Sequence, residues 1–285
     1  MLYRKGELMK INKIFVLCIT IVTILVWGVN ISLFYSKRLE NPIFFKNYID
    51  SDGNMYINYL DNDYNEDYIV SISFPEINEE RFYVNNHNIM NNNGYILREI
   101  ILDNNFINDL LVKEESDVNV TKIKYYTNEG ATNIVNIGEI NFSKPILYDK
   151  KYLILKENLS YTQNYTSTIS FIAKDTVKLE EYTSKYKEFI LDNYYIYIND
   201  EPIQNISYPI EFKRDENIKL SYKKKYENSD SVGFGIMYNM FIAFKFVDPE
   251  GTIDYKKLYF TNQNSDYSKY MNKKSIDKLK EGRIL

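Results

Sequence analysis

The pattern of apolar and polar residues divides the chain into one uninterrupted apolar segment near the N-terminus and a long remainder of short alternating runs. Residues 14–34 read IFVLCITIVTILVWGVNISLF and contain no charged side chain. A helix of this length covers about 30 Å, which is the thickness of the hydrocarbon core of a bilayer. Trp27 and Phe34 lie toward its distal end, where aromatic side chains commonly mark a membrane interface. The pattern therefore predicts a transmembrane helix over residues 14–34 that contacts membrane lipid.

The charges that flank this segment predict its orientation. Four Lys or Arg residues and one Glu precede it in the sequence. Lys and Arg near a membrane span are retained on the cytoplasmic side. We therefore expect residues 1–13 in the cytoplasm and the C-terminal part of the chain outside the cell.

A cleaved signal peptide is the alternative interpretation. Met9 begins a run with a short basic region, so either Met1 or Met9 fits a translation start. The apolar segment is longer than the usual apolar region of about 7 to 15 residues, and no A-x-A cleavage site follows it. The pattern favours the anchor, whereas cleavage would release a secreted protein that begins near Val29.

From residue 35 onward the dominant signal is two-residue alternation in short runs. In residues 217–224, Ile218, Leu220 and Tyr222 alternate with Lys and Ser. This period places one set of side chains on each face of a strand, so it predicts strands that are half-buried on sheets. No long helical period competes with these runs, and we expect the exterior part to be all-β and antiparallel.

Clusters of Asn, Asp and Gly separate the runs and predict hairpin turns. The clusters lie at residues 128–130, 199–202 and 248–251. Asn-Gly and Asp-Gly types of turn join antiparallel strands closely. Gly138 interrupts the alternation after the first turn, as a glycine at a β-bulge does.

These elements define a fold class and a domain order. We predict an all-β protein with a single N-terminal transmembrane helix and two tandem antiparallel β-sandwich domains, which resemble immunoglobulin-like or fibronectin-like modules in size. No motif assigns the chain to a named family. The expected order after the helix is a linker at 35–44, a first sandwich at 45–146, a second sandwich at 147–262, and a polar basic tail at 263–285 with a helix at 274–281.

Charge and rare residues exclude several classes of function. The net charge is −4, but the N-terminal flank and the tail are basic, so the region between them is acidic and disfavours nucleic-acid binding. Cys18 and His87 are the only Cys and His, which is too few for a Cys/His zinc site or an internal disulfide. Phosphate-binding and dinucleotide-binding glycine motifs are absent, so we expect no nucleotide and no cofactor. A cysteine-free exterior part favours a bacterial surface protein.

One acidic cluster has the spacing of a calcium loop. Asp61, Asp63 and Asp67 supply alternating oxygen ligands, the donors that Ca²⁺ prefers. However, Glu66 stands where the loop needs Gly, and Ile72 stands where it needs the terminal Glu. A solvated turn is the simpler interpretation, and a calcium site of another type is the alternative.

Tyrosines offer a candidate binding surface. In the strand predicted at 194–198, Tyr195 and Tyr197 point away from the face that carries Tyr194, Ile196 and Ile198. Exposed tyrosines stack on sugar rings or form protein interfaces. The simpler alternative is that they form ordinary cross-strand pairs.

We therefore expect a membrane-anchored extracytoplasmic protein with a non-catalytic structural or recognition role. Its expected partner is another envelope protein or a wall polysaccharide. The alternative is an envelope glycan hydrolase, because a pair of carboxylates is sufficient for that chemistry. Nothing in the spacing of the 39 Asp and Glu residues selects such a pair.

Overall fold

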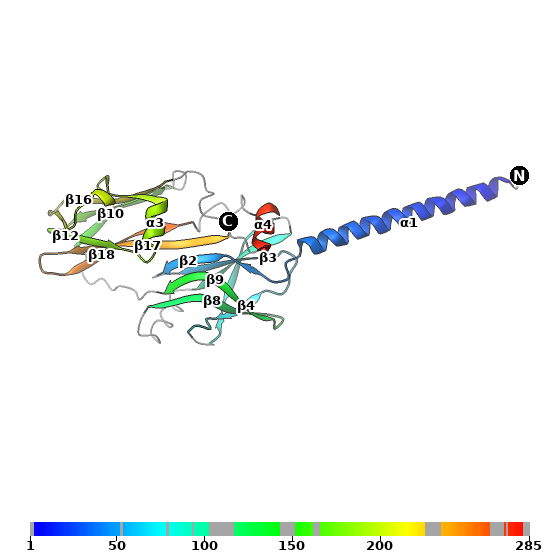
Figure 1. Ribbon diagram of the computed structural model, residues 1–285, viewed down its shortest axis with the longest axis horizontal. Helices are drawn as coiled ribbons and strands as arrows, with labels where there is room; N and C mark the ends of the chain where they lie inside the picture. The colour runs from blue at the N-terminus through cyan, green and yellow to red at the C-terminus, as the bar shows by residue number, and fades with distance from the viewer. Residues whose placement is uncertain are drawn as a thin grey trace.

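The computed structural model describes residues 3–51, 54–77, 80–92, 94–102, 117–142, 152–161, 166–225, 235–262, 271 and 273–281. A long N-terminal helix leads into a body built mostly of β-strands, and the helix projects away from that body (Figure 1). The prediction of a mostly β protein with one apolar N-terminal helix is confirmed.

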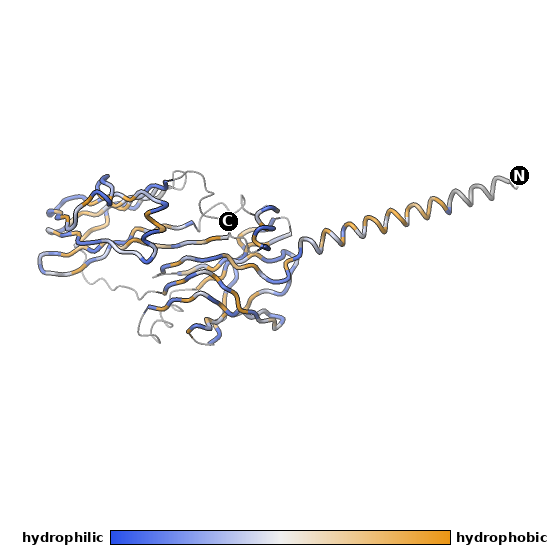
Figure 2. The backbone as a smooth tube through the Cα atoms, viewed as in Figure 1, coloured by the Kyte–Doolittle hydropathy of each residue, from blue (hydrophilic) through white to orange (hydrophobic). Residues whose placement is uncertain are grey.

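Helix α1 spans Tyr3–Lys37 and contains the predicted membrane segment. Its stretch Lys13–Ser36 is long and apolar enough to cross a membrane, and none of it is buried in the protein. Apolar residues are nearly continuous along this stretch (Figure 2). The hydroxyls of Thr20 and Thr23 donate to carbonyls four residues earlier at 2.9 Å, which satisfies them without water. A signal sequence near the N-terminus would pass the same test of length and apolar composition as this helix.

Among the described residues, the strands form three sheets and the remaining helices are short. The four-stranded sheet has the order β1 (Ile43–Phe44), β3 (Met55–Asn62), β7 (Tyr95–Leu102), β6 (Asn85–Asn92). The five-stranded sheet has the order β10 (Leu153–Tyr161), β11 (Thr166–Ala173), β16 (Asn217–Lys224), β13 (Tyr194–Ile198), β14 (Glu201–Pro202). The nine-stranded sheet has the order β15 (Ile210–Phe212), β12 (Val177–Thr183), β17 (Ile236–Val247), β2 (Lys46–Ser51), β9 (Thr132–Phe142), β8 (Val118–Thr127), β4 (Ile69–Ser73), β5 (Phe82–Tyr83), and β18 (Ile253–Thr261) pairs with β17. The short helices are α3 (Lys187–Asn193), the 3₁₀ turn η1 (Ile203–Asn205) and α4 (Lys273–Lys280).

Two large apolar cores lie in the body, and each packs on a different half of the nine-stranded sheet. The first core joins the four-stranded sheet to strands β2, β4, β8 and β9. Its largest fully buried side chains include Tyr59 of β3, Tyr125 of β8 and Phe142 of β9. The second core joins the five-stranded sheet to strands β12, β15, β17 and β18, with Phe244 and Phe260 at its centre. Alternation in the strands supplies both cores, because every second side chain faces inward.

Strand β16 shows this alternation directly. Ile218 and Leu220 are buried, and the Tyr222 ring stacks on Phe260 with centroids 4.5 Å apart. Lys223 is exposed on the opposite face. Burial raises the pKa of Tyr222 to about 12, which agrees with an inward-facing phenol.

A pair of substitutions tests this assignment of faces. Tyr222→Asp should lower the free energy of unfolding by about 3 kcal/mol, because it places a carboxylate in an apolar core. Lys223→Asp should change it by less than about 0.5 kcal/mol, as surface substitutions do. Denaturant unfolding of the full chain in detergent measures both values, and equal losses would contradict the assignment.

Strand β2 joins the two halves of the body. It lies between β9 and β17 and runs parallel to both, with Asn47 opposite Gly138 on one side and opposite Met237 on the other. The expectation of purely antiparallel sheets is therefore wrong at β2. The predicted boundary at 146–147 lies outside the described residues, but strands from both predicted domains share one sheet.

The predicted turns are present. The Asn128–Gly130 turn joins β8 to β9, and the turn at 248–251 joins β17 to β18. Asn199 and Asp200, which separate β13 from β14, both adopt positive φ, as a tight hairpin turn with this twist requires. Gly138 adopts φ +95° beside a register shift between β8 and β9, so the predicted bulge is confirmed.

The segments predicted as linker and tail are both structured where they are described. Within 35–44, α1 continues to Lys37, Leu39 is buried, and β1 pairs with β3. Within 263–285, α4 buries Ile276 and Leu279 in a small third core that also contains Leu39. The segment predicted as a polar basic tail therefore packs an apolar face of α4 on the start of the β body.

Candidate functional site

The outer face of the five-stranded sheet carries the two tyrosines that the alternation singles out. Tyr194, Ile196 and Ile198 are buried on the inner face of β13, whereas Tyr195 is 47% exposed and Tyr197 is partly exposed on the outer face. This placement agrees with the alternation in the sequence. The face therefore presents two aromatic rings to the surroundings.

The neighbours of these tyrosines across the sheet are hydroxylic and basic. Tyr195 lies opposite Lys223 of β16, which in turn lies opposite Thr166 of β11. In the next outward-facing row, Tyr197 lies opposite Ser221, and Ser221 lies opposite Thr168. We call the outer face of the sheet at Tyr195, Tyr197, Ser221, Lys223, Thr166 and Thr168 the tyrosine face, in which Ser221 is only 8% exposed.

Two further lysines border the tyrosine face. The Lys225 ammonium lies 5.2 Å from the centroid of the Tyr195 ring, within the range of a cation–π interaction. The Lys219 ammonium is 2.8 Å from a carboxylate oxygen of Asp200 in the β13–β14 turn. Rings, hydroxyls and ammonium groups in this arrangement suit stacking on sugar rings and hydrogen bonding to their hydroxyls. In the register of β13 and β16, the cross-strand neighbours of the two tyrosines are Lys223 and Ser221.

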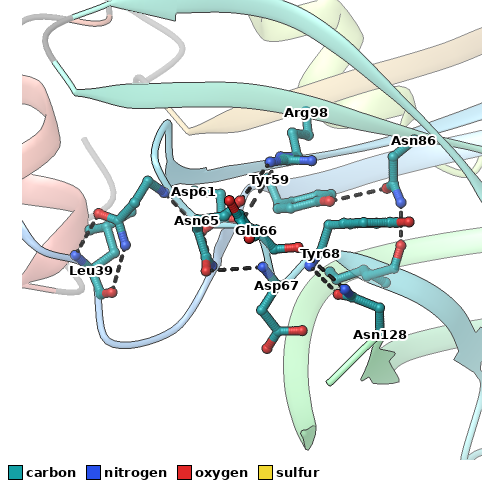
Figure 3. A network of polar contacts seen from close by, with 12 residues as sticks. Leu39, Tyr59, Asp61, Asn65, Glu66, Asp67, Tyr68, Asn86, Arg98 and Asn128 are labelled. Carbon is teal, nitrogen blue, oxygen red and sulfur yellow. Dashed lines mark hydrogen bonds and ion pairs between the residues drawn. The ribbon is translucent and has the colours of Figure 1, made fainter. Parts of the chain in front are cut away.

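The three aspartates of the calcium-like cluster have different surroundings, and Figure 3 shows those of Asp61 and Asp67. Asp61 is buried, and its carboxylate lies 3.8 Å from Nε of Arg98 on β7. Asp67 accepts a hydrogen bond of 3.1 Å from the backbone N–H of Glu129, and Asp63 is exposed. In the described part of the chain, no three His, Cys, Asp or Glu side chains are placed to hold a metal ion together.

Asn65 connects this cluster into one network. Its amide donates to Asp61 at 3.1 Å, its side-chain oxygen accepts from the Asp67 N–H at 3.2 Å, and its carbonyl lies 3.4 Å from the Arg98 guanidinium. Asn128 extends the network by accepting the Tyr68 N–H at 2.7 Å. The contacts fasten the β3–β4 loop to the β8–β9 turn (Figure 3).

Electrostatics at Asp61 follows from its burial. Removal from water raises the pKa of its carboxyl, and hydrogen bonds from Asn65 and the Asn62 N–H together with the Arg98 charge act in the opposite direction. Burial also raises the pKa of the neighbouring Tyr59 phenol. The sequence offered no signal for Arg98, because its contact with Asp61 depends on the pairing of β3 with β7.

Two buried carboxylates of the described chain each lie close to a cation. Asp254 is buried on β18, its pKa is raised by burial, and the Lys256 ammonium lies 2.9 Å from its carboxylate. Asp61 and Asp254 thus each face a cation, and they stand in different cores. This geometry suits ion pairing at Asp61 and at Asp254.

The two aromatic residues expected at the membrane interface lie at different positions along α1. Phe34 is near the end of α1, and its ring centroid is 5.0 Å from that of Tyr64 in the β3–β4 loop. Trp27 lies seven residues earlier on α1 and is exposed. Phe34 therefore lies at the level where the β body begins, and Trp27 lies about 10 Å further along the helix.

Comparison with known proteins adds little. No protein-family model matches the chain, and no curated protein matches it. One solved structure with partial likeness is a Ca²⁺-stabilised adhesin that helps an Antarctic bacterium reach out and bind ice. The sequence identity is 13% and the TM-score is 0.17, and the match covers 73% of this chain and 43% of that chain. Another is the YadV chaperone, with 6% identity, a TM-score of 0.19, and coverage of 75% and 96%. This chain spans less than half of the adhesin, and neither likeness carries an argument about fold or function.

Proposed function

We propose that this protein is a single-pass membrane protein, with residues 1–13 in the cytoplasm, that presents its β body outside the cell as a non-catalytic recognition component. The tyrosine face is the recognition surface, and its partner is a wall polysaccharide. One observation carries the proposal. An unburied apolar helix lies at one end of the molecule, and the sheet that bears the tyrosine face lies at the other (Figure 1).

The helix supports the anchoring part of the proposal. A soluble protein buries the apolar side chains of a core helix, whereas those of α1 remain outside the β body. Hydrocarbon lipid is the environment that covers such a helix on all sides. The basic residues before the apolar stretch favour the N-terminus in the cytoplasm.

The chemistry of the tyrosine face supports a polysaccharide partner. Sugar rings stack on exposed aromatic side chains, and their hydroxyls bond to hydroxylic and amine groups. Lys223 and the bordering lysines add positive charge, which suits a polymer that carries acidic groups. Another envelope protein is the alternative partner for the same rings.

Binding to isolated wall polysaccharide tests the proposal. The full chain, held in detergent micelles or nanodiscs, should co-sediment with the polysaccharide, and Tyr195→Ser/Tyr197→Ser should weaken binding about tenfold, because each stacked ring contributes about 0.5–1.5 kcal/mol. Tyr83→Ser is the matched control, because Tyr83 is 90% exposed on β5, away from the tyrosine face. This substitution should leave binding unchanged.

The outcomes separate the partners. If the wild-type chain does not bind the polysaccharide but binds one envelope protein through the same two tyrosines, the partner is a protein and not a glycan. Equal effects of the Tyr83 and Tyr195/Tyr197 variants would contradict the assignment of the tyrosine face.

A further inference from the structure

The C-terminal helix returns to the end of the membrane helix. The Lys280 ammonium lies 3.2 Å from the carbonyl oxygen of Ser36, the last residue of the apolar stretch, and 3.3 Å from the hydroxyl of Tyr95. A cation at this position also interacts favourably with the C-terminal end of the α1 dipole. Figure 1 shows α4 beside the junction between α1 and the β body.

The β3–β4 loop also reaches the C-terminal end of α1. Tyr64 packs on Phe34 and remains 44% exposed. The next residue of α1, Tyr35, is exposed and makes an edge-to-face contact with Phe34 at 5.7 Å. Arg38 is exposed, and its charge acts on the Tyr64 phenol. Three aromatic rings and an arginine thus surround the point where α1 leaves the β body.

The start of the β body is fastened to this point. The side-chain amide of Asn62 accepts from the Leu39 N–H at 2.9 Å and donates to the Leu39 carbonyl at 2.8 Å. Leu39 itself is buried beside Ile276 and Leu279 of α4. The β3–β4 loop with Tyr64 and helix α4 are therefore held in a fixed position along the axis of α1, close to its C-terminal end.

Basic side chains are concentrated at the end of α1 and on α4. Lys274 is exposed, and Lys278 follows it four residues later, so both lie on one side of α4. In the two segments at 35–40 and 273–281, six Lys or Arg residues stand against three acidic residues. The β3–β4 loop adds Asp63, Glu66 and Asp67, of which Asp67 accepts the Glu129 N–H. Helix α4 is only about 12 Å long, so its lysines remain close to the position of Ser36 along the axis of α1.

We propose that Phe34, Tyr35 and Tyr64 lie in the interfacial layer of the membrane that α1 spans, and that Arg38, Lys274 and Lys278 contact the phosphates of anionic phospholipids. We call this surface the membrane collar. It rests on the proposed anchoring of α1. Tyrosine rings favour the headgroup layer, and lysines held close to an anionic surface are attracted to it.

Depth-dependent quenching in vesicles tests the collar separately from the anchor. The full chain is reconstituted in phosphatidylcholine vesicles with or without phosphatidylglycerol, and single cysteines carry an environment-sensitive fluorophore. Native Cys18 reports on the anchor. Asp63→Cys reports on the collar and Tyr195→Cys on the remote end, each in a Cys18→Ala background. Quenchers are placed on the lipid headgroup or on the acyl chain.

We expect acyl-chain quenching at Cys18, headgroup quenching at position 63, and none at position 195. Adding phosphatidylglycerol should increase quenching at position 63, and the increase should be lost in Lys274→Gln/Lys278→Gln and at high salt. Lys223 lies on the tyrosine face and Lys219 borders it, so Lys219→Gln/Lys223→Gln is the matched control and should retain the increase.

Each contrary result has a distinct meaning. A label at position 63 that stays unquenched while Cys18 is quenched overturns the collar and leaves the anchor. Loss of Cys18 quenching, or a mature chain that lacks Cys18, overturns the anchor and the collar together. Quenching at position 63 that does not respond to phosphatidylglycerol or to the α4 lysines overturns the contact with anionic lipid.

Discussion

Replacing Arg98 by methionine is expected to lower the free energy of unfolding by about 3–5 kcal/mol, because the substitution leaves the Asp61 carboxylate buried without its cation. Asp61 and Arg98 are 1% and 12% exposed, and their closest charged atoms are 3.8 Å apart. Chemical denaturation of the full chain in detergent micelles measures the loss. Methionine keeps most of the volume of the arginine stem, so packing changes contribute little.

Lys178→Met is the matched control. Lys178 and Glu211 lie 3.9 Å apart, nearly the same separation, but both are more than half exposed. Water screens such a pair, so its loss should cost less than about 1 kcal/mol. Equal losses in the two variants would show that burial does not govern the Asp61–Arg98 contact.

The effect of Arg98→Met should also depend on pH. Burial raises the pKa of Asp61 in the folded state above its unfolded value, and removal of the Arg98 charge raises it further. A carboxyl group whose pKa is higher in the folded than in the unfolded state binds its proton more tightly when folded. Its charged form therefore destabilises the folded state at a pH above the folded pKa, and this loss of stability disappears as the pH falls toward the unfolded pKa. The destabilisation should therefore be largest at neutral pH and shrink in mild acid. A constant loss across this range would contradict a charged Asp61.

The second large effect is expected at Gly138. A Cβ atom there would lie 2.6 Å from the backbone nitrogen of Asn47 and closer still to its carbonyl oxygen, so β2 would have to move away from β9. Gly138 also has φ +95°, which side chains disfavour. Gly138→Ala should lower the free energy of unfolding by about 3 kcal/mol or more, from strain and backbone overlap together.

Gly130→Ala separates the two contributions. Gly130 has nearly the same φ, +92°, but no atom lies within 4 Å of the added Cβ. Its substitution should therefore cost only the conformational strain, about 1–2 kcal/mol. Both variants are compared by denaturant unfolding. A Gly138 variant no less stable than the Gly130 variant would show that β2 does not approach β9 as closely as the structure describes.

Local patterns in the sequence predicted many of the individual elements. The inward face of β13, the turn between β8 and β9 and the bulge at Gly138 follow from side-chain alternation and from the conformational freedom of glycine. The apolar helix follows from the length of one uncharged run. In each case the physical cause acts within a few neighbouring residues, so the sequence contains all of the information.

Candidate sites were predicted unevenly for the same reason. The exposure of Tyr195 depends only on the period of its own strand, so the sequence placed it correctly. The environment of Asp61 depends on Arg98, which is 37 positions away and lies beside it because β3 pairs with β7. The acidic spacing alone predicted a solvated turn, with a calcium site as the alternative, and neither interpretation includes the ion pair with Arg98.

By itself, the sequence determined that the protein has an apolar helix followed by strands with one buried and one exposed face. The tertiary structure decided where those strands go: β2 lies between β9 and β17, and α4 returns to Ser36. Backbone N–H and C=O groups are the same on every strand edge, so the local pattern cannot select a partner. That choice is made by the joint packing of distant side chains such as Leu39, Ile276 and Leu279, which exists only in the folded chain.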